Sequence, residues 1–320
     1  MTVTSVTAPR VTARVPAKIN LQLAVGPLRA DGYHGLVTVF HAISLFDEVT
    51  VEAATADSVA VAGEGADHVP ADGDNLALRG VRALREALVA RDGAAPDAGP
   101  DGRAGVAVSI RKRIPVAGGL AGGSADAAAA LVACNELWQA ALSASELCEV
   151  AARVGSDVAF AVQGGTAVGR GRGEQLTSAL VAPVRYHWVL AFADGHLSTP
   201  AVYGTLDRLR GDEAVGEPEL SADLMSALRA GDAARVGAAL GNDLQAPALA
   251  MLPALRKTLA AGREFGSLGA LVSGSGPTCF FLARDERHAT DLAVALSSAD
   301  VARTVTTATG AAPGATVINR

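Results

Sequence analysis

The sequence predicts a two-domain protein of the α+β class, and three observations support this. The chain has 320 residues, which is enough for two domains with well-filled cores. Half of its residues are hydrophobic and 19% are charged, which is the composition of a folded globular protein. Strand-like and helix-like stretches occur in groups and do not alternate as they would around a parallel sheet. We predict domains over residues 1–165 and 166–320, and leave open a return of the final strand to the first domain.

The first domain is predicted to open with strands. Apolar and polar residues alternate from Arg10 to Val25 and again over residues 35–54, as in half-buried strands. Residues 74–93 change to helical spacing, with Gly93 at the end and an apolar face made of Leu76, Val81, Leu84 and Leu88. Residues 91–105 are rich in Gly, Pro and Asp, which predicts a mobile surface loop. Residues 106–115 read as a further strand.

Helices dominate the predictions for the rest of the chain. One helix is expected to run to about Ala140, and the capping-box spacing of Ser143 and Glu146 predicts another that ends near Gly155. The domain boundary is placed near Gly164, where paired glycines and a new strand follow the last strong helical segment. Beyond it we expect a strand over 187–192, several helices between 199 and 262, a strand near 269–276, and a final helix and strand.

Charge and cysteine usage exclude several classes of protein. The formal net charge is −6, and no block of Lys and Arg provides an electrostatic footprint for nucleic acid or an anionic membrane. The three cysteines are widely spaced and form no CxxC pair, which argues against a disulfide framework or a zinc site and fits a reducing cytoplasm. The first residues lack the apolar core of a signal peptide, and every long apolar run is interrupted. We therefore predict a cytoplasmic protein with neither a nucleic-acid nor a membrane partner.

The stretch "IPVAGGLAGGSADAAAAL" places four glycines directly before a run of alanines. Glycine costs about 1 kcal/mol relative to alanine inside a helix, so the glycines are expected to precede the helix, with Ser124 as its N-cap. Loop amides and a helix N-terminus together form an anion site, most usefully for phosphate. A tight turn with close helix packing explains the glycines equally well, and both readings stay open. Asp126 is expected near the phosphates, where it favours the helix dipole and has no assigned catalytic role.

Common phosphate and nucleophile motifs do not account for this stretch. No lysine follows the glycines as a P-loop requires, and neither GxGxxG nor GxSxG occurs. The run "SIRK" at Ser109 lies in a predicted strand without its partner motifs and is set aside.

Three motifs occur in order along the chain: "VPAKIN" at 15–20, "PVAGGLAGGSADA" at 115–127 and "SGSGPT" at 273–278. As a set they resemble the GHMP kinases, named for galactokinase, homoserine kinase, mevalonate kinase and phosphomevalonate kinase. The resemblance covers nearly the whole chain. It implies a ribosomal-protein-S5-like N-terminal domain, a ferredoxin-like α+β C-terminal domain, and an ATP-dependent small-molecule kinase.

Further runs narrow the resemblance within the family. "RADGYH", "DNLALR", "VGSDVAF", "STPAVY" and "GNDLQ" resemble members that phosphorylate 4-diphosphocytidyl-2-C-methyl-D-erythritol in the non-mevalonate isoprenoid pathway. This implies phosphorylation of the 2-hydroxyl of the methylerythritol moiety, ATP as cosubstrate, Mg²⁺ as cofactor, and a monomer or homodimer.

The resemblance implies catalytic roles for Lys18 and Asp157. Taken alone, a lysine in an alternating strand usually lies on its solvated face, and Asp157 reads as an N-cap for the next turn. The resemblance instead places the two side by side. Lys18 would keep the carboxylate ionised and offset charge on the moving phosphoryl group. Asp157 would accept the substrate proton or hold the hydroxyl in line.

The resemblance also implies an ATP site at the glycine stretch. Mg²⁺ would bridge phosphate oxygens, and Ser124 is the expected protein contact to it. The residues expected at ATP are Asn75, Pro115, Val116, Ala117, Gly118, Gly119, Leu120, Ala121, Gly122, Gly123, Ser124 and Ala125.

Five residues are implied at the cytidyl substrate. Tyr33 and His34 would bind the cytidine, by stacking and by hydrogen bonds to its polar edge, and Tyr203 would lie over the base. Asn20 and Thr199 would supply polar contacts. Residues 274–276 would close the site from the second domain, although a plain β-turn explains them nearly as well.

Two alternatives remain open. A sibling kinase acting on homoserine or a mevalonate derivative shares the glycine stretch but lacks the "DGYH" run. A non-catalytic ligand-binding protein on the same scaffold has no use for Lys18 and Asp157 as a pair.

Overall fold

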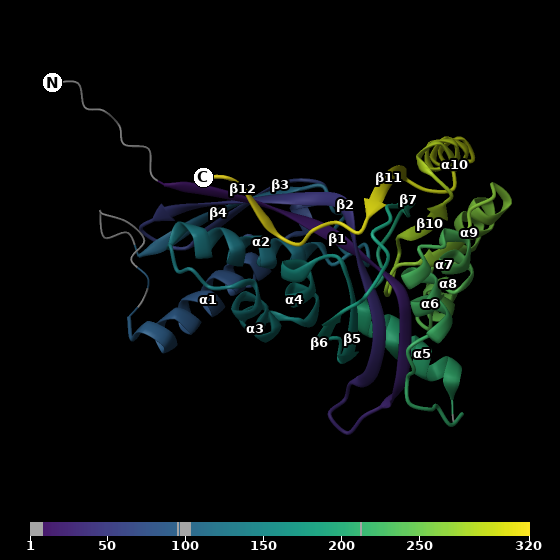
Figure 1. The fold of residues 1–320 in the computed structure, drawn as a ribbon, viewed down its shortest axis with the longest axis horizontal. Helices are drawn as coiled ribbons and strands as arrows, with labels where there is room; N and C mark the ends of the chain where they lie inside the picture. The colour runs from purple at the N-terminus through teal and green to yellow at the C-terminus, as the bar shows by residue number, and fades with distance from the viewer. Residues whose placement is uncertain (1–8, 95, 97–103, 212) are drawn as a thin grey trace.

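The strands of the chain join into a single mixed sheet, with helices grouped around each half of it. The computed structural model describes residues 9–94, 96, 104–211 and 213–320. Within these residues one 12-stranded sheet has the central order β12-β1-β2-β11-β7-β10-β9. Helices α1 to α4 lie against the N-terminal half, and α5 to α10 surround the strands of the C-terminal half (Figure 1). The predicted α+β class is confirmed.

The N-terminal half is built on a long antiparallel hairpin that projects beside α5 (Figure 1). Its strands are β1 (Arg10–Leu28), β2 (His34–Ala54), β3 (Ser58–Gly63), β4 (Gly105–Lys112), β5 (Thr166–Gly171) and β6 (Gln175–Ser178). Its helices are the short 3-10 helix η1 (Ala66–His68), α1 (Leu76–Asp92), α2 (Gly122–Leu137), α3 (Ala144–Val154) and α4 (Ser156–Gln163). Strand β2 pairs with β1, β4 and β5, so it organises this half.

The C-terminal half contributes β7 (Tyr186–Phe192), β8 (Gly241–Asn242), β9 (Gly269–Val272), β10 (Cys279–Ala283), β11 (Thr304–Gly310) and β12 (Thr316–Asn319). Its helices are α5 (Thr199–Arg210), α6 (Ala222–Ala230), α7 (Ala233–Ala238), α8 (Gln245–Met251), α9 (Ala254–Glu264) and α10 (Glu286–Ser298). Strand β11 pairs along β7 and touches β2, and β12 pairs with β1. The last strands thus tie the two halves together. The boundary after residue 165 stays a prediction.

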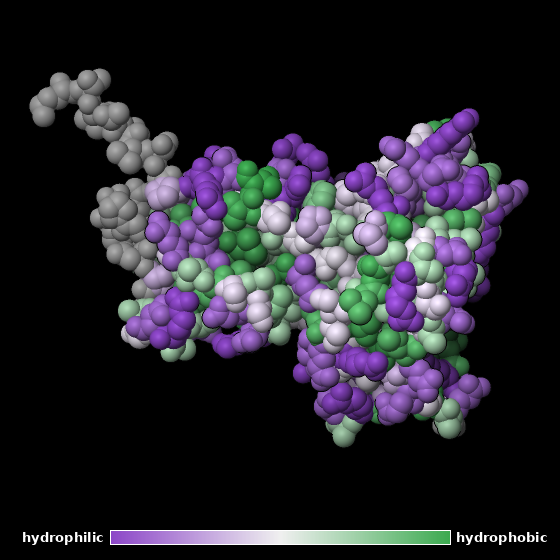
Figure 2. All heavy atoms as spheres, viewed as in Figure 1, coloured by the Kyte–Doolittle hydropathy of each residue, from purple (hydrophilic) through white to green (hydrophobic). Residues whose placement is uncertain are grey.

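Apolar burial runs through both halves. One core lies between α1, α2 and the strands β1, β2 and β4 and continues into the C-terminal half through β7, β10 and α6. A second core packs α5, α9 and α10 on β7 and β10. Helix α2 is apolar on nearly all sides, with residues 127–131 fully buried, as expected of a helix inside a core. Figure 2 shows the outline hollowed between the α1–α4 side and the hydrophilic end of the hairpin.

Several local predictions are confirmed by caps. Helix α1 ends at Gly93 with φ of 76°, the left-handed conformation that glycine adopts readily. Helix α3 carries the capping box of Ser143 and Glu146, with both reciprocal hydrogen bonds formed. The loop predicted over residues 91–105 falls largely outside the described residues. Among the helices that are described, none combines the length and apolar character needed to cross a membrane.

The predicted start of the glycine-stretch helix is wrong. Helix α2 begins at Gly122, so Gly122 and Gly123 lie in its first turn, and Ser124 is not the N-cap. Ala121 takes the N-cap position with φ of 59° and makes no side-chain cap hydrogen bond. The free-energy cost of glycine applies to helix interiors. It has less influence on where a helix begins, because the amides of a first turn have no intrahelical partner.

A buried ion cluster joins β2, β4 and α2. The Lys112 ammonium donates to Asp47 at 2.5 Å and to Asp126 at 2.7 Å, and all three side chains are at most 3% exposed. Asp47 also accepts from the backbone amides of Arg113 and Ile114, which lead into the glycine stretch. Asp126, for which the sequence predicts a place near the phosphates, lies in α2 and is engaged by this lysine, and its place relative to the phosphates stays a prediction.

The cluster is short of positive charge. Burial by itself lowers the pKa of Lys112, but the charges of Asp126 and Asp47 outweigh burial and raise it overall. The pKa of Asp126 is raised well above its usual value, first by burial and also by the charge of Asp47, against the opposing effect of Lys112. Its second oxygen, Oδ1, is buried without a hydrogen-bond partner. Asp126 is therefore the weakly compensated member of the cluster.

We predict that Lys112→Met lowers the free energy of unfolding by about 3–5 kcal/mol, because it leaves two buried carboxylates without a cation. Urea unfolding followed by circular dichroism measures this. Lys257→Met on the exposed face of α9 is the matched control and should change stability by less than about 0.5 kcal/mol. Equal effects of the two substitutions would refute the cluster's structural role.

The free energy of unfolding of Asp126→Asn should increase relative to that of the wild type as the pH rises. Because the folded state holds the Asp126 proton to a higher pH than the unfolded state, unfolding releases that proton above about pH 4, and the free energy of unfolding falls with pH. Asparagine removes this contribution. Urea unfolding of both proteins at pH 5 and pH 8 should show the variant gaining on the wild type. A difference that does not change with pH would contradict the assignment.

Candidate active site

A cavity of about 560 Å³ lies where the two halves meet. Strands β1 and β2, the loop before α2, the start of α4, helix α5 and the turn after β9 all contribute to its lining. All three motifs singled out in the sequence therefore reach one space. The predicted site residues that line it are Lys18, Asn20, Ala117, Gly118, Gly119, Ala121, Gly122, Gly123, Ser124, Asp157, Thr199 and Tyr203.

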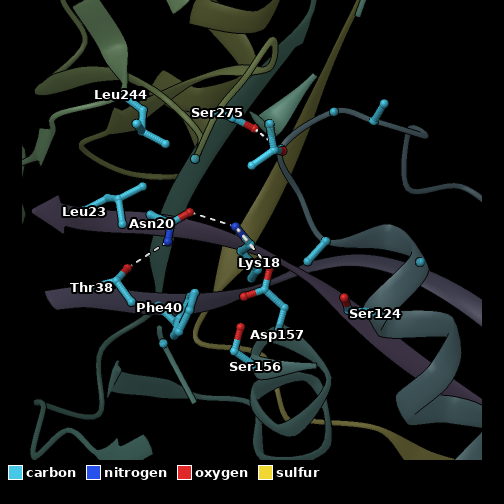
Figure 3. A pocket seen from close by; sticks show the side chains of 18 of the residues that line it. Lys18, Asn20, Leu23, Thr38, Phe40, Ser124, Ser156, Asp157, Leu244 and Ser275 are labelled. Atoms are coloured by element: carbon cyan, nitrogen blue, oxygen red, sulfur yellow. Dashed lines mark hydrogen bonds and ion pairs between the residues drawn. The ribbon is translucent and has the colours of Figure 1, made fainter. Parts of the chain in front are cut away.

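Lys18 is held in the cavity by a short chain of polar contacts (Figure 3). Its Nζ donates to Asn20 Oδ1 at 2.8 Å and lies 3.8 Å from Asp157 Oδ2. Asn20 Nδ2 in turn donates to Thr38 Oγ1 at 2.8 Å. The β1–β2 register shifts on both sides of this stretch, between Pro16 and Ala17 and just after Asn20. Such bulges commonly re-aim side chains beside functional sites.

Asp157 lies in the first turn of α4, facing Lys18 (Figure 3). The helix dipole favours negative charge at this position. Its side chain is 31% exposed, against 9% for Lys18, so the carboxylate keeps a surface toward the cavity. The N-cap of α4 is Gly155, so Asp157 does not have the capping role that its position suggested.

Tyr203 on α5 reaches the same cavity from the C-terminal half. Its pKa is raised to about 12, mainly by burial and further by the charges of Asp157 and Asp243. The phenol therefore stays neutral at physiological pH. It lies close enough to the Asp157 carboxylate for the charge of that group to affect its pKa.

The glycine loop is held against the C-terminal half by its backbone. Ser273 Oγ donates to the Gly119 carbonyl at 2.9 Å, and the Thr278 amide donates to the Gly118 carbonyl at 3.3 Å. Gly119 has φ of 76°, and a Cβ on it would lie 2.1 Å from the Ser273 carbonyl oxygen. No other residue fits this position. Close packing and exposure of the loop to the cavity are thus both present, and the two readings of the glycines do not exclude each other.

The turn at residues 273–276 of the C-terminal half also approaches Lys18. Gly274 has φ of 55°, and a Cβ there would lie 3.3 Å from Asn20 Oδ1 and 3.4 Å from Lys18 Nζ. Asn242 Nδ2 donates to the Val272 and Gly274 carbonyls at 2.8 and 2.7 Å, which fixes the turn. The turn carries a further contact between Ser275 Oγ and Thr199 Oγ1 at 2.9 Å.

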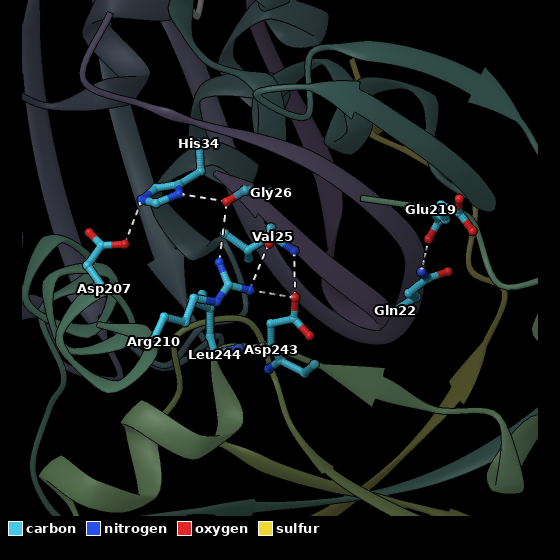
Figure 4. A network of polar contacts seen from close by, with 10 residues as sticks. Gln22, Val25, Gly26, His34, Asp207, Arg210, Glu219, Asp243 and Leu244 are labelled. Carbon is cyan, nitrogen blue, oxygen red and sulfur yellow. Dashed lines mark hydrogen bonds and ion pairs between the residues drawn. The ribbon is translucent and has the colours of Figure 1, made fainter. Parts of the chain in front are cut away.

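His34 and Tyr203 lie together, with ring centroids 5.4 Å apart and planes at 27°. His34 Nδ1 is 2.9 Å from the Gly26 carbonyl, to which it must donate, and Nε2 is 3.3 Å from Asp207 Oδ1 (Figure 4). Both ring nitrogens are therefore occupied by the protein. A hydrogen bond from His34 to a cytosine base would have to compete with the contact to Asp207. Stacking of the aromatic residues on the base stays a prediction.

Tyr33 and Asn75 are predicted site residues that do not line this cavity. Tyr33 is 54% exposed at the end of the hairpin, outside the cavity lining. Asn75 caps α1, accepting from the Ala77 amide at 2.8 Å and donating to the Pro70 carbonyl at 2.7 Å. It faces a neighbouring cavity of about 220 Å³ that also touches Val116.

Three further residues predicted at ATP are buried and do not line the cavity. Pro115, Leu120 and Ala125 are buried, the last two at 0% and 1% exposure. The Lys18 amide donates to the Leu120 carbonyl at 3.2 Å, which fastens the loop to β1.

Sequence reasoning missed the residues that hold the hairpin to the C-terminal half. Arg210 at the end of α5 donates to the Val25 carbonyl at 2.8 Å, and its guanidinium lies 3.2 Å from Asp243 (Figure 4). Asp243 also accepts from the Val25 amide at 2.8 Å. The run "GNDLQ" marked this place in the sequence, but nothing in it indicated a partner more than two hundred residues away.

Comparisons with known proteins agree with this arrangement. A family model described as the GHMP kinases N terminal domain matches residues 75–165, and one described as GHMP kinases C terminal matches residues 224–302. A protein of Thermobifida fusca named 4-diphosphocytidyl-2-C-methyl-D-erythritol kinase is 55% identical over 96% of this chain and 98% of its own length. A protein of Mycolicibacterium smegmatis with the same name is 52% identical over 98% of this chain and 94% of its own.

A solved structure is also similar over most of its length. A crystal structure of 4-(cytidine 5'-diphospho)-2C-methyl-D-erythritol kinase superposes with a TM-score of 0.71 and 32% identity. The match covers 93% of this chain and 98% of that one. Both halves of the fold are thus shared with one solved protein.

Proposed function

The chain belongs to the GHMP kinases, and on that basis we propose that it transfers the γ-phosphoryl group of ATP to the 2-hydroxyl of 4-diphosphocytidyl-2-C-methyl-D-erythritol. One structural observation supports the chemistry: the Lys18–Asp157 pair, the glycine loop and Tyr203 all line a single cavity. The names of the relatives from Thermobifida fusca and Mycolicibacterium smegmatis carry the choice of substrate.

Asp157 receives the attacking hydroxyl in this proposal. Its carboxylate keeps a surface toward the cavity and accepts the hydrogen bond of the 2-hydroxyl, which aligns the oxygen with the γ-phosphorus. The new O–P bond forms as the bond from the γ-phosphorus to the leaving ADP oxygen breaks, and the hydroxyl proton passes toward Asp157. Because the transition state of phosphoryl transfer is loose, alignment matters more than proton removal.

Lys18 supplies fixed positive charge beside the transferred group. Its ammonium is held by Asn20 and lies 3.8 Å from Asp157, so it needs little reorganisation when negative charge shifts toward the leaving oxygen. The glycine loop and the first turn of α2 offer backbone amides for the ATP phosphates. Tyr203 offers an aromatic face at the cytidine end, with Asn20 and Thr199 as polar contacts.

The oxygen donors near the loop fit Mg²⁺. No group of three or more acidic, histidine or cysteine side chains among the described residues forms a metal cage by itself. Mg²⁺ in kinases takes one or two protein oxygens and completes its shell with phosphates and water, and the Ser124 hydroxyl meets that need. When bound, the ion would neutralise charge on the ATP phosphates.

The proposed function is tested by measuring ADP release with four acceptors. We expect turnover of 4-diphosphocytidyl-2-C-methyl-D-erythritol and none of mevalonate, homoserine or galactose. Turnover of another acceptor alone would leave the family intact and refute the substrate. Binding of ATP without turnover of any acceptor would favour a ligand-binding protein on the same scaffold.

Asp157→Asn should lower kcat by about 10²- to 10⁴-fold and change KM for either substrate by less than about threefold. The reason is that the carboxylate acts on the reacting hydroxyl and contributes little to binding the cytidyl group or ATP. Asp291→Asn, on the exposed face of α10, removes the same charge and should leave kcat unchanged. Near-normal kcat in Asp157→Asn would rule out its catalytic role.

A further inference from the structure

The turn between β5 and β6 brings an arginine to the edge of the cavity. Arg172 and Gly173 both line it. A Cβ placed on Gly173 would lie 3.6 Å from Ser156 and from the Phe40 ring, so the turn packs beside the residue that precedes Asp157. Residue 172 therefore stands next to the predicted reaction centre.

The Arg172 side chain extends toward the cytidine end of the site. Its guanidinium carbon lies 4.5 Å from the centroid of the Tyr33 ring, in the geometry of a cation–π contact. Tyr33 itself belongs to the hairpin end, next to His34 and its stack with Tyr203. Arg172 thus lines the cavity that holds the Asp157 carboxylate and contacts the Tyr33 ring at the hairpin end.

Arg172 is also the uncompensated charge of the cavity. Among the described residues that line it, only Lys18, Asp157 and Arg172 are charged, and the first two face each other. The nearby Glu174 accepts from the Arg172 backbone amide at 2.6 Å, which shapes the turn. No carboxylate in the described part of the chain forms an ion pair with the Arg172 guanidinium.

We propose that Arg172 binds the diphosphate of the cytidyl substrate and so determines specificity for it over the free nucleoside. The inference rests on the proposed function, in which the base lies near Tyr203 and the 2-hydroxyl lies at Asp157. The diphosphate joins these two ends, and the proposal places it at the turn that carries Arg172, which lines the same cavity as Asp157 and Tyr203. A guanidinium offers several N–H donors in a planar fork, which matches phosphate oxygens well. Its contact with Tyr33 would hold that fork in place.

The test compares Arg172→Gln with Arg172→Lys and with Arg170→Gln as the matched control. Arg170 lies on the same hairpin, exposed and outside the cavity lining. Arg172→Gln should raise KM for the cytidyl substrate by about 10- to 100-fold, the range for a lost charge-assisted contact, with kcat within about twofold. Arg172→Lys should recover part of the loss, and Arg170→Gln should behave as the wild type. An unchanged KM for ATP confirms that each variant is folded.

Inhibition by CDP and by cytidine separates contact with the diphosphate from contact with the base. Arg172→Gln should weaken inhibition by CDP about as much as it raises KM, and should change inhibition by cytidine by less than about twofold. Equal weakening of both would mean that Arg172 acts only by supporting Tyr33, and equal values in Arg172→Gln and Arg170→Gln would refute any role.

The two proposals can fail separately. If the wild type does not turn over the cytidyl substrate, the proposed function fails. Calorimetric binding of CDP and cytidine to the same variants then decides the Arg172 assignment without turnover: selective loss of CDP binding supports it, and no selective loss overturns it.

Discussion

The site depends on the way the backbone of the glycine loop is held from two sides. The Lys18 amide fastens the Leu120 carbonyl to β1, and Ser273 and Thr278 bind the two carbonyls before it. Three segments far apart in the sequence therefore share one rigid junction. Because Gly119 lets the backbone approach where a Cβ would collide with the Ser273 carbonyl, the junction is close enough to bring Lys18 and the α4 carboxylate to the loop. Glycine here serves packing and access together.

Charges in the molecule divide between holding the fold and facing the cavity. Lys112 is fully engaged by two buried carboxylates, and Asp47 of that cluster also binds the amides that lead into the loop. Lys18 is only partly satisfied, since its closest oxygen is a neutral amide and Asp157 lies 3.8 Å away. Arg172 has an aromatic ring as its contact. Lys18 and Arg172, which line the cavity, therefore have more of their charge available to a ligand than Lys112, which is fully paired inside the fold.

Much of the fold could be predicted from the sequence, because its signals are local. Strand alternation and the caps at Gly93 and Ser143 act within a few residues. The start of α2 could not be predicted in this way, because the helix cost of glycine has little effect at a first turn whose amides have no intrahelical partner. Motif resemblance indicated Lys18 and Asp157. It could not show that the ring nitrogens of His34 contact Gly26 and Asp207, or that Arg172 reaches the hairpin end. These contacts join residues that are distant in the sequence or in different turns, and no local sequence pattern predicts them.

In the proposed reaction, Asp157 and Lys18 meet the reacting groups at the junction of the two halves. A crystal structure of the ternary complex with a non-hydrolysable ATP analogue and 4-diphosphocytidyl-2-C-methyl-D-erythritol would locate these groups. We expect the 2-hydroxyl within hydrogen-bond distance of an Asp157 oxygen, the γ-phosphate analogue beside Lys18, and the triphosphate on the amides at the start of α2. A 2-hydroxyl directed away from Asp157, or a triphosphate bound elsewhere, would refute these roles.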